Sequence, residues 1–156
     1  MSRAGGRYGV TVIGAGNIAA AHIDAITRSP EAHLVGIASR TPAKAHALAG
    51  RHGVRAFDSV AMAVADPETD IVAVCTPSGA HLDPALLAIA AGKHVVIEKP
   101  LEVTTARAVQ IIEAAERAGV ALATIFMSRF ADANVFVKRA VAKGQLGPLI
   151  QGDAFV

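Results

Sequence analysis

The chain has 156 residues, of which 53% are hydrophobic and 4% aromatic, with 15 basic and 13 acidic residues. This length suffices for one well-buried domain but not comfortably for two, and the shortage of aromatic residues means that small aliphatic side chains build the core. The charged residues are scattered rather than clustered, so nucleic-acid binding has little support. No apolar run is long enough to cross a membrane and no signal peptide is evident, so we expect a cytoplasmic protein.

The cysteine and histidine content argues against disulfide and metal chemistry. Cys75 is the only cysteine, so it has no intrachain partner, and its apolar surroundings in the sequence favour an inert buried thiol. The six histidines show neither an H-E-x-x-H motif nor a pair spaced four residues apart. We therefore predict no metal site.

A strand, a glycine turn and a helix are predicted near the start of the chain. The apolar run Tyr8–Ile13 leads into Gly14, which permits a sharp turn, and Gly16, which lets backbone N–H groups approach a phosphate without a Cβ in the way. The small Ala19 then allows the helix to pack close to the strand. A helix N-terminus placed in this way favours the pyrophosphate of a dinucleotide, although a lone glycine turn also occurs as a simple connection.

Strand-like apolar runs continue along the chain, and a helical stretch separates each from the next. Thr41 and Pro42 form a helix start, while Gly53, Gly92 and Gly119 lie where helices should end. Such alternation predicts an α/β domain with a doubly wound parallel sheet, the Rossmann arrangement, covered by helices on both faces. The predicted strands are 8–13, 33–38, 54–57, 71–75, 94–97 and 121–126.

The pattern changes after Phe126. A helix is predicted at 131–143, a turn at 144–148 and a strand at 149–156. A strand without a partner leaves backbone donors and acceptors unpaired, so we expect it to join another edge, such as that of a second copy. We divide the chain into a dinucleotide-binding domain, 1–126, and the incomplete beginning of a second α/β domain, 127–156.

Three motifs together resemble the glucose-fructose oxidoreductase, inositol dehydrogenase and rhizopine-catabolism (Gfo/Idh/MocA) family. The resemblance covers nearly the whole chain and implies an NAD(P)-dependent oxidoreductase that transfers hydride between a nicotinamide coenzyme and a sugar, polyol or related hydroxyl or carbonyl compound. Members are usually about twice as long, and their second domain supplies the substrate pocket and much of the oligomer contact. The motifs are Gly14-x-Gly16-x-x-Ala19-x-x-His22, Cys75-Thr76-Pro77-Ser78-x-x-His81 and Glu98-Lys99-Pro100.

The resemblance also implies which residues contact the coenzyme, and most of them follow predicted strands. The pyrophosphate would lie on the glycine turn and the first residues of the helix, and the path to the nicotinamide ribose would run past the second motif. His81 is either a contact to coenzyme or substrate or an interior histidine. The implied cofactor-binding residues are Gly14, Gly16, Asn17, Ile18, Thr76, Pro77, His81, Glu98 and Lys99.

Ser39 and Arg40 end the second predicted strand, where many members of the family carry an acidic residue. A carboxylate there would accept a hydrogen bond from the adenosine ribose 2′-OH and repel a 2′-phosphate, whereas a hydroxyl beside an arginine can bind that phosphate. We therefore expect both residues to contact the coenzyme and NADP to be preferred, with NAD as second choice. The alternative is an exposed arginine at a helix start.

Lys99 is the residue that we expect to be catalytic. Oxidation of an alcohol by hydride transfer requires removal of the hydroxyl proton, and an ammonium beside the substrate oxygen can stabilise the alkoxide or relay that proton. The alternative is that Lys99 only ends a strand in solvent. The resemblance also suggests a cis peptide bond before Pro100, which proline permits.

Two other functions are consistent with the same first domain. One is a non-catalytic module that senses NAD(P) and changes a protein interaction, and the other is a dimerising fragment without a physiological ligand. For each reading the expected partners are a small molecule or another protein rather than nucleic acid or a membrane, and a homo-oligomer is expected.

Overall fold

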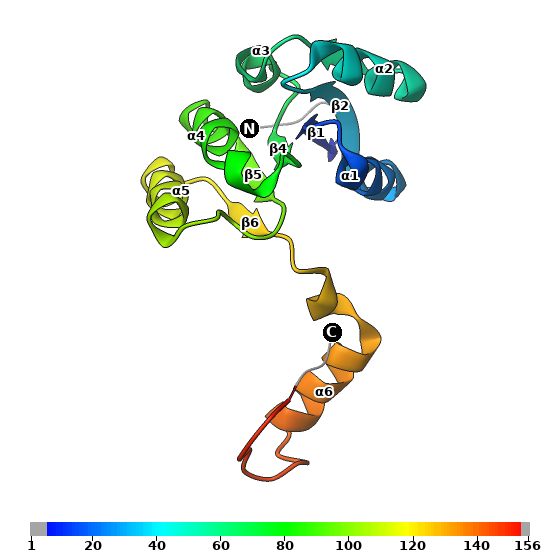
Figure 1. Ribbon diagram of the computed structural model, residues 1–156. Coiled ribbons are helices and arrows are strands. Elements are labelled where there is room, and N and C mark those ends of the chain that lie inside the picture. Colours follow the sequence, from blue (N-terminus) through cyan, green and yellow to red (C-terminus); the bar gives the residue numbers. More distant parts are fainter. Residues whose placement is uncertain (1–5, 154–156) are drawn as a thin grey trace. The chain divides into compact units, whose positions relative to one another are not determined.

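The computed structural model describes residues 6–153, and the chain divides into two compact units, Met1–Ile125 and Phe126–Val156. The described part of the first unit contains a six-stranded parallel sheet with the order β3-β2-β1-β4-β5-β6 (Figure 1). The order reverses between β1 and β4, which is the arrangement of a doubly wound domain. The strands are β1 Tyr8–Ile13, β2 Ala32–Ala38, β3 Arg55–Phe57, β4 Ile71–Val74, β5 His94–Ile97 and β6 Leu122–Thr124.

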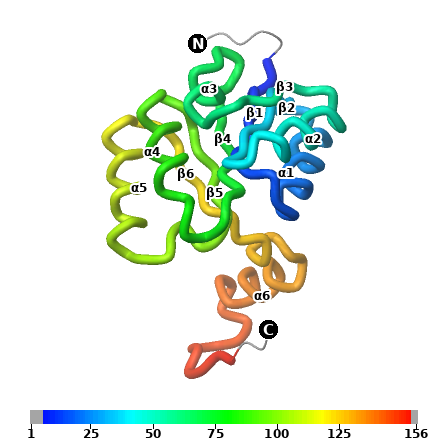
Figure 2. The backbone as a smooth tube through the Cα atoms, turned by 45° about the horizontal axis from the view of Figure 1, so that its top comes forward, coloured from blue at the N-terminus to red at the C-terminus, as the bar shows by residue number. Residues whose placement is uncertain are grey.

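Helices cover both faces of this sheet, as predicted. One core contains Ile23 of α1 and Ala45 of α2, and the other contains Ile89 of α4 and Ile111 of α5. Figure 2 shows α4 and α5 side by side, with α1 and α2 on the other side of the strands. The helices of this unit are α1 Asn17–Arg28, α2 Pro42–His52, α3 Val60–Ala65, α4 Leu82–Ala90 and α5 Thr105–Ala118.

The helix boundaries follow local sequence signals. The hydroxyl of Thr104 accepts a hydrogen bond from the backbone N–H of Arg107 and so caps α5. Gly53 and Gly119 end α2 and α5, with φ of 63° and 64°. Glycine adopts this left-handed conformation most readily because it has no Cβ. The ends of α2 and α5 therefore lie directly before the next parallel strands, β3 and β6.

The described part of the second unit is helical. It contains a 3-10 turn, Met127–Phe130, and α6, Asp132–Ala142. The strand predicted at 149–156 is wrong for residues 149–153, which form no strand. A strand needs the backbone groups of a neighbouring strand, and no described segment of this unit offers them. Residues 154–156 lie outside the described residues.

None of the helices in residues 6–153 combines the length and the apolar character that a membrane span requires. The longest is α5, with 14 residues.

Gly14 allows β1 and β4 to end close together. Its φ is 119°, and a Cβ built on it would lie 2.4 Å from the carbonyl oxygen of Cys75. Both observations exclude a side chain, because L-residues rarely adopt this conformation and the obstructing atom belongs to the backbone. Gly50, within α2, has no atom within 4 Å of the corresponding position.

We expect Gly14→Ala to lower the free energy of unfolding by about 2 kcal/mol or more, because the new Cβ forces the two strand ends apart. Gly50→Ala is the matched control and should raise that free energy by about 0.5–1 kcal/mol, because alanine favours the helix. Urea unfolding followed by circular dichroism measures both. An unchanged midpoint for Gly14→Ala would contradict the close approach.

Candidate functional site

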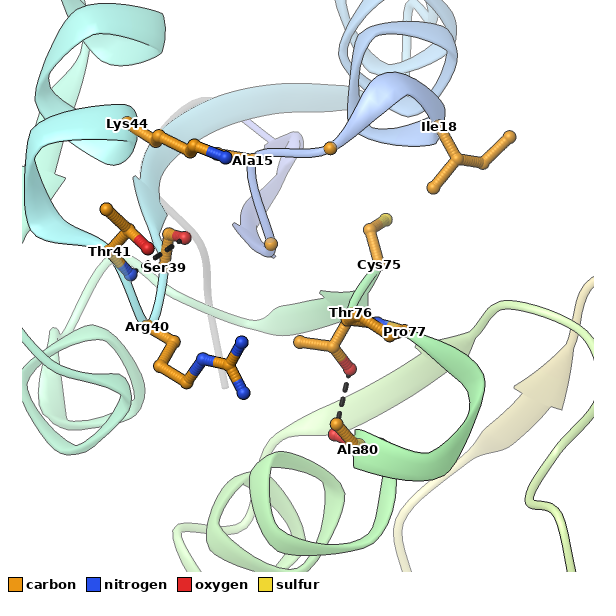
Figure 3. A pocket seen from close by; sticks show the side chains of 12 residues that line it. Ala15, Ile18, Ser39, Arg40, Thr41, Lys44, Cys75, Thr76, Pro77 and Ala80 are labelled. Carbon is orange, nitrogen blue, oxygen red and sulfur yellow. Dashed lines mark hydrogen bonds between the residues drawn. The ribbon is translucent and has the colours of Figure 1, made fainter.

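A cavity of about 370 Å³ opens at the carboxyl end of the sheet. Its walls come from the segments that follow β1, β2 and β4, so it lies where the strand order reverses. Open parallel sheets bind ligands at this place. The lining residues, drawn in Figure 3, are Gly14, Ala15, Gly16, Ile18, Ser39, Arg40, Thr41, Lys44, Cys75, Thr76, Pro77 and Ala80.

The glycine turn presents unpaired backbone N–H groups to this cavity. Gly14 donates its N–H to the carbonyl of Ala38, but within residues 6–153 the N–H groups of residues 15–18 have no acceptor. Gly16 is the N-cap of α1 without a side-chain cap, and the first turn of α1 contains no acidic residue. A Cβ on Gly16 would meet nothing within 4 Å, so space remains above these donors. The turn can therefore hold an anion on the N-terminus of a twelve-residue helix.

The wall that follows β2 is basic. Arg40 extends its guanidinium across the cavity in the direction of Thr76, and the ammonium of Lys44 points toward Ala15 (Figure 3). The hydroxyl of Ser39 accepts a hydrogen bond from the N–H of Thr41, at 3.3 Å. No Asp or Glu is among the lining residues. This wall suits a phosphate better than a ribose diol that needs a carboxylate acceptor.

Thr76 and Pro77 form the opposite wall. The hydroxyl of Thr76 donates to the carbonyl of Ala80, at 2.8 Å, so this loop is closed by its own hydrogen bonds (Figure 3). Cys75 also lines the cavity but is only 4% exposed. Burial, assisted by the charge of Glu98, raises the pKa of its thiol to about 12. Cys75 is therefore protonated at neutral pH, in agreement with the inert thiol predicted from the sequence.

Glu98 and Lys99 follow β5 at the same edge of the sheet but do not line this cavity. Glu98 is 7% exposed, and its Oε1 lies 2.8 Å from Nε2 of His22. Its Oε2 accepts the backbone N–H of Lys99, at 3.1 Å. The Lys99 side chain is exposed, and its ammonium has no hydrogen bond or ion pair among residues 6–153. The peptide bond between Lys99 and Pro100 is cis, as the resemblance suggests.

Besides Glu98 and Lys99, two further residues implied as coenzyme contacts, Asn17 and His81, are not among the lining residues. Asn17 begins α1 and is exposed, beside the turn but not in its wall. His81 is 1% exposed, and its Nε2 lies 2.9 Å from the carbonyl oxygen of Thr76 while its Nδ1 lies 3.0 Å from that of Pro100. His81 therefore has the surroundings of an interior histidine, because both ring nitrogens already face protein carbonyls.

Lys44 is the lining residue of most chemical interest that the sequence analysis missed. It belongs to the first turn of α2, whose start at Thr41 and Pro42 was predicted. A side chain in that turn lies near the carboxyl end of β2, so placing the first turn of each helix at this edge would have found it. The described residues contain no cluster of three or more His, Cys, Asp or Glu side chains able to hold a metal ion.

Known proteins match this chain both in sequence and in structure. The 1,5-anhydro-D-fructose reductase of Ensifer adhaerens is 35% identical over 96% of this chain and 44% of its own length. The inositol 2-dehydrogenase of Rhizobium meliloti is 32% identical over 90% of this chain and 42% of its own. The chain thus spans less than half the length of these curated relatives.

The solved structure of the WlbA dehydrogenase from Bordetella pertussis, in complex with NADH and UDP-GlcNAcA, superposes with a TM-score of 0.86. It is 31% identical and matches 90% of this chain and 43% of that one. The model of the oxidoreductase family with an NAD-binding Rossmann fold matches residues 8–126, which include the whole sheet. The chain therefore belongs to the Gfo/Idh/MocA family of oxidoreductases.

Proposed function

We propose that this chain is the coenzyme-binding part of an NAD(P)-dependent oxidoreductase that acts on a sugar, polyol or related hydroxyl compound. The observation that carries the proposal is the cavity at the reversal of strand order, where uncapped N–H groups of α1 face a basic wall. The names of the two curated relatives concern a sugar derivative and inositol, which supports this substrate class. A cytoplasmic location is part of the same proposal.

Different residues of this chain bind different parts of the coenzyme. The N–H groups of residues 15–18 hold the pyrophosphate, with Gly14 shaping the turn and Gly16 leaving the space above it. Thr76 and Pro77 line the path to the nicotinamide ribose, and Glu98 and Lys99 lie beyond it. A bound nicotinamide coenzyme supplies or accepts the hydride.

The basic wall favours NADP over NAD. The 2′-phosphate of NADP would lie between the guanidinium of Arg40 and the ammonium of Lys44, with the hydroxyl of Ser39 as a further donor. A charge-assisted hydrogen bond contributes about 1.5–3 kcal/mol, so Arg40 accounts for a preference of roughly ten- to a hundredfold. The absence of Asp and Glu from the lining residues supports the same choice.

Lys99 completes the proposed mechanism. Its ammonium is exposed and has no partner among residues 6–153, so it is available to a substrate oxygen. A cation at that place stabilises the alkoxide that forms as the hydroxyl proton leaves, or carries that proton away. The backbone of Lys99 is meanwhile fixed through the carboxylate of Glu98.

The coenzyme preference predicts the effect of Arg40→Ala. Titration calorimetry of the chain at fixed salt should show tighter binding of NADPH than of NADH, and Arg40→Ala should weaken NADPH binding about ten- to a hundredfold while NADH binding changes less than about twofold. Arg51→Ala, at the other end of α2, is the matched control and should change neither. Tighter binding of NADH by the unsubstituted chain would remove the NADP preference but keep the oxidoreductase proposal.

Lys99→Met tests the catalytic role. In a protein that carries this domain together with a substrate domain, we expect turnover to fall by about 10²–10⁴, the usual contribution of a proton-transfer group, while coenzyme affinity is kept. Arg117→Met, which replaces an exposed cation on α5, should leave turnover unchanged. Equal turnover of the Lys99 variant and the parent would exclude Lys99 from the mechanism and favour the non-catalytic sensor.

We also propose that this chain forms a homo-oligomer through residues 126–153 of its second unit. Phe130, Phe136 and Ile150 are 81%, 71% and 97% exposed, and apolar surface of this kind tends to be covered by a partner. Light scattering at high concentration should give a mass above 15.9 kDa. The double variant Phe136→Glu, Ile150→Glu should return it to the monomer mass, whereas Met62→Glu, at an exposed apolar residue of α3, should not. A monomer at every concentration would contradict self-association.

A further inference from the structure

Two neighbouring loops at the coenzyme edge of the sheet are joined through side chains. The β4–α4 loop, residues 75–81, carries Thr76 and Pro77, and the β5–α5 loop, residues 98–104, carries Lys99. The N–H of Glu98 donates to the carbonyl of Val74, at 3.0 Å. Within residues 6–153, no backbone–backbone hydrogen bond joins the two loops beyond this point. Beyond it, the described hydrogen bonds that link these loops or the helix starts that follow them all involve His81, Glu102 or Arg107.

His81 is the last residue of the β4–α4 loop, and its ring contacts both its own loop and the β5–α5 loop. Its Nε2 is 2.9 Å from the carbonyl oxygen of Thr76, and its Nδ1 is 3.0 Å and 3.3 Å from those of Pro100 and Leu101. Carbonyl oxygens only accept hydrogen bonds, so each bond requires an N–H on the ring: a neutral ring donates on one side and a protonated ring on both. Because the side chain is 1% exposed, water does not compete for these contacts. His81 therefore connects the residue that lines the cavity to the residues that directly follow Lys99.

Glu102 and Arg107 make a second connection beside the first. The Glu102 carboxylate accepts the N–H of Leu82, at 3.1 Å, and that of Val103, at 2.7 Å, and it pairs with Arg107 at 2.9 Å. Arg107 also donates to the carbonyl of Gly79, at 3.3 Å. The hydrogen bond from Arg107, reinforced by the two backbone N–H groups, lowers the pKa of Glu102 to about 2. The carboxylate is thus ionised at neutral pH and remains paired.

The loop that carries Lys99 is held on its other side as well. Glu98 contacts His22 of α1 through Oε1 and receives the N–H of Lys99 on Oε2. The backbone around Lys99 is therefore fixed from α1 and from the β4–α4 loop, whereas its ammonium has no partner among the described residues. Fixing the backbone of a residue with a free functional group is what a positioned catalytic side chain requires.

We infer that His81, Glu102 and Arg107 are positioning residues that hold the Thr76 and Lys99 loops in register around the nicotinamide end of the coenzyme. This inference rests on the proposed function. The adenosine diphosphate end is held elsewhere, by the N-terminus of α1 and by Ser39 and Arg40. The three positioning residues therefore act on one end of the ligand and not on the other, which distinguishes them from residues that only stabilise the fold.

The test compares a whole coenzyme with the same molecule lacking nicotinamide. Calorimetry measures the affinity of the chain for NADPH and for 2′-phospho-ADP-ribose, or for NADH and ADP-ribose if that pair binds more tightly. Glu102 and Arg107 are replaced together, as Glu102→Gln with Arg107→Gln, because loss of one partner would leave a buried charge unpaired. The matched control is Glu113→Gln with Arg117→Gln, the exposed ion pair on the same helix.

We expect the double variant to lose about tenfold in affinity for the whole coenzyme, equivalent to one good hydrogen bond, while its affinity for the truncated ligand stays within about twofold. His81→Gln keeps one donor nitrogen and should show the same loss for the whole coenzyme with little change for the truncated ligand. This variant replaces the double variant in the test if the double variant does not fold. Equal losses for both ligands, or no loss, would overturn the positioning role. If the unsubstituted chain bound neither ligand, the proposed function itself would fail and the inference with it.

Discussion

Gly14 lies where β1 and β4 end side by side, and a Cβ there would stand 2.4 Å from the carbonyl oxygen of Cys75. The two strands approach this closely because the chain turns at Gly14 with a φ of 119°, which L-residues with side chains rarely adopt. The same turn sends α1 to one face of the sheet, while the chain after β4 passes to the other face in α4. The cavity lies where these two helices leave the sheet, and Gly14 is among the residues that line it.

The proposed coenzyme contacts at that edge fall into two halves, one that would bind phosphate and one that carries Lys99. Uncapped N–H groups and the cations Arg40 and Lys44 lie on the side of β1 and β2, where a helix N-terminus and positive charge attract phosphate. Lys99 and the loops that fix it lie on the side of β4 and β5. The first half needs charge and open space, whereas the second needs a rigid backbone, and the buried contacts of His81, Glu98 and Glu102 provide that rigidity.

The fold was largely predictable because its signals are local. Apolar runs gave the strands of the sheet, and Gly53 and Gly119 ended helices where expected. The strand at 149–153 was wrong because strand formation depends on a partner, which an apolar pattern cannot reveal. In the site, the glycine turn, Ser39 and Arg40 could be predicted from their position after strands. The contacts of His81 with backbone carbonyls could not, because the sequence does not distinguish a histidine that faces carbonyls from one that faces a ligand.

We propose that the cavity between the glycine turn and the basic wall holds the coenzyme. A crystal structure of the chain grown with NADPH tests it most directly. We expect the pyrophosphate against the N–H groups of residues 15–18, the 2′-phosphate between Arg40 and Lys44, and the nicotinamide directed past Thr76 toward Lys99. Density for the coenzyme elsewhere, or a pyrophosphate that makes no contact with the turn, would contradict it.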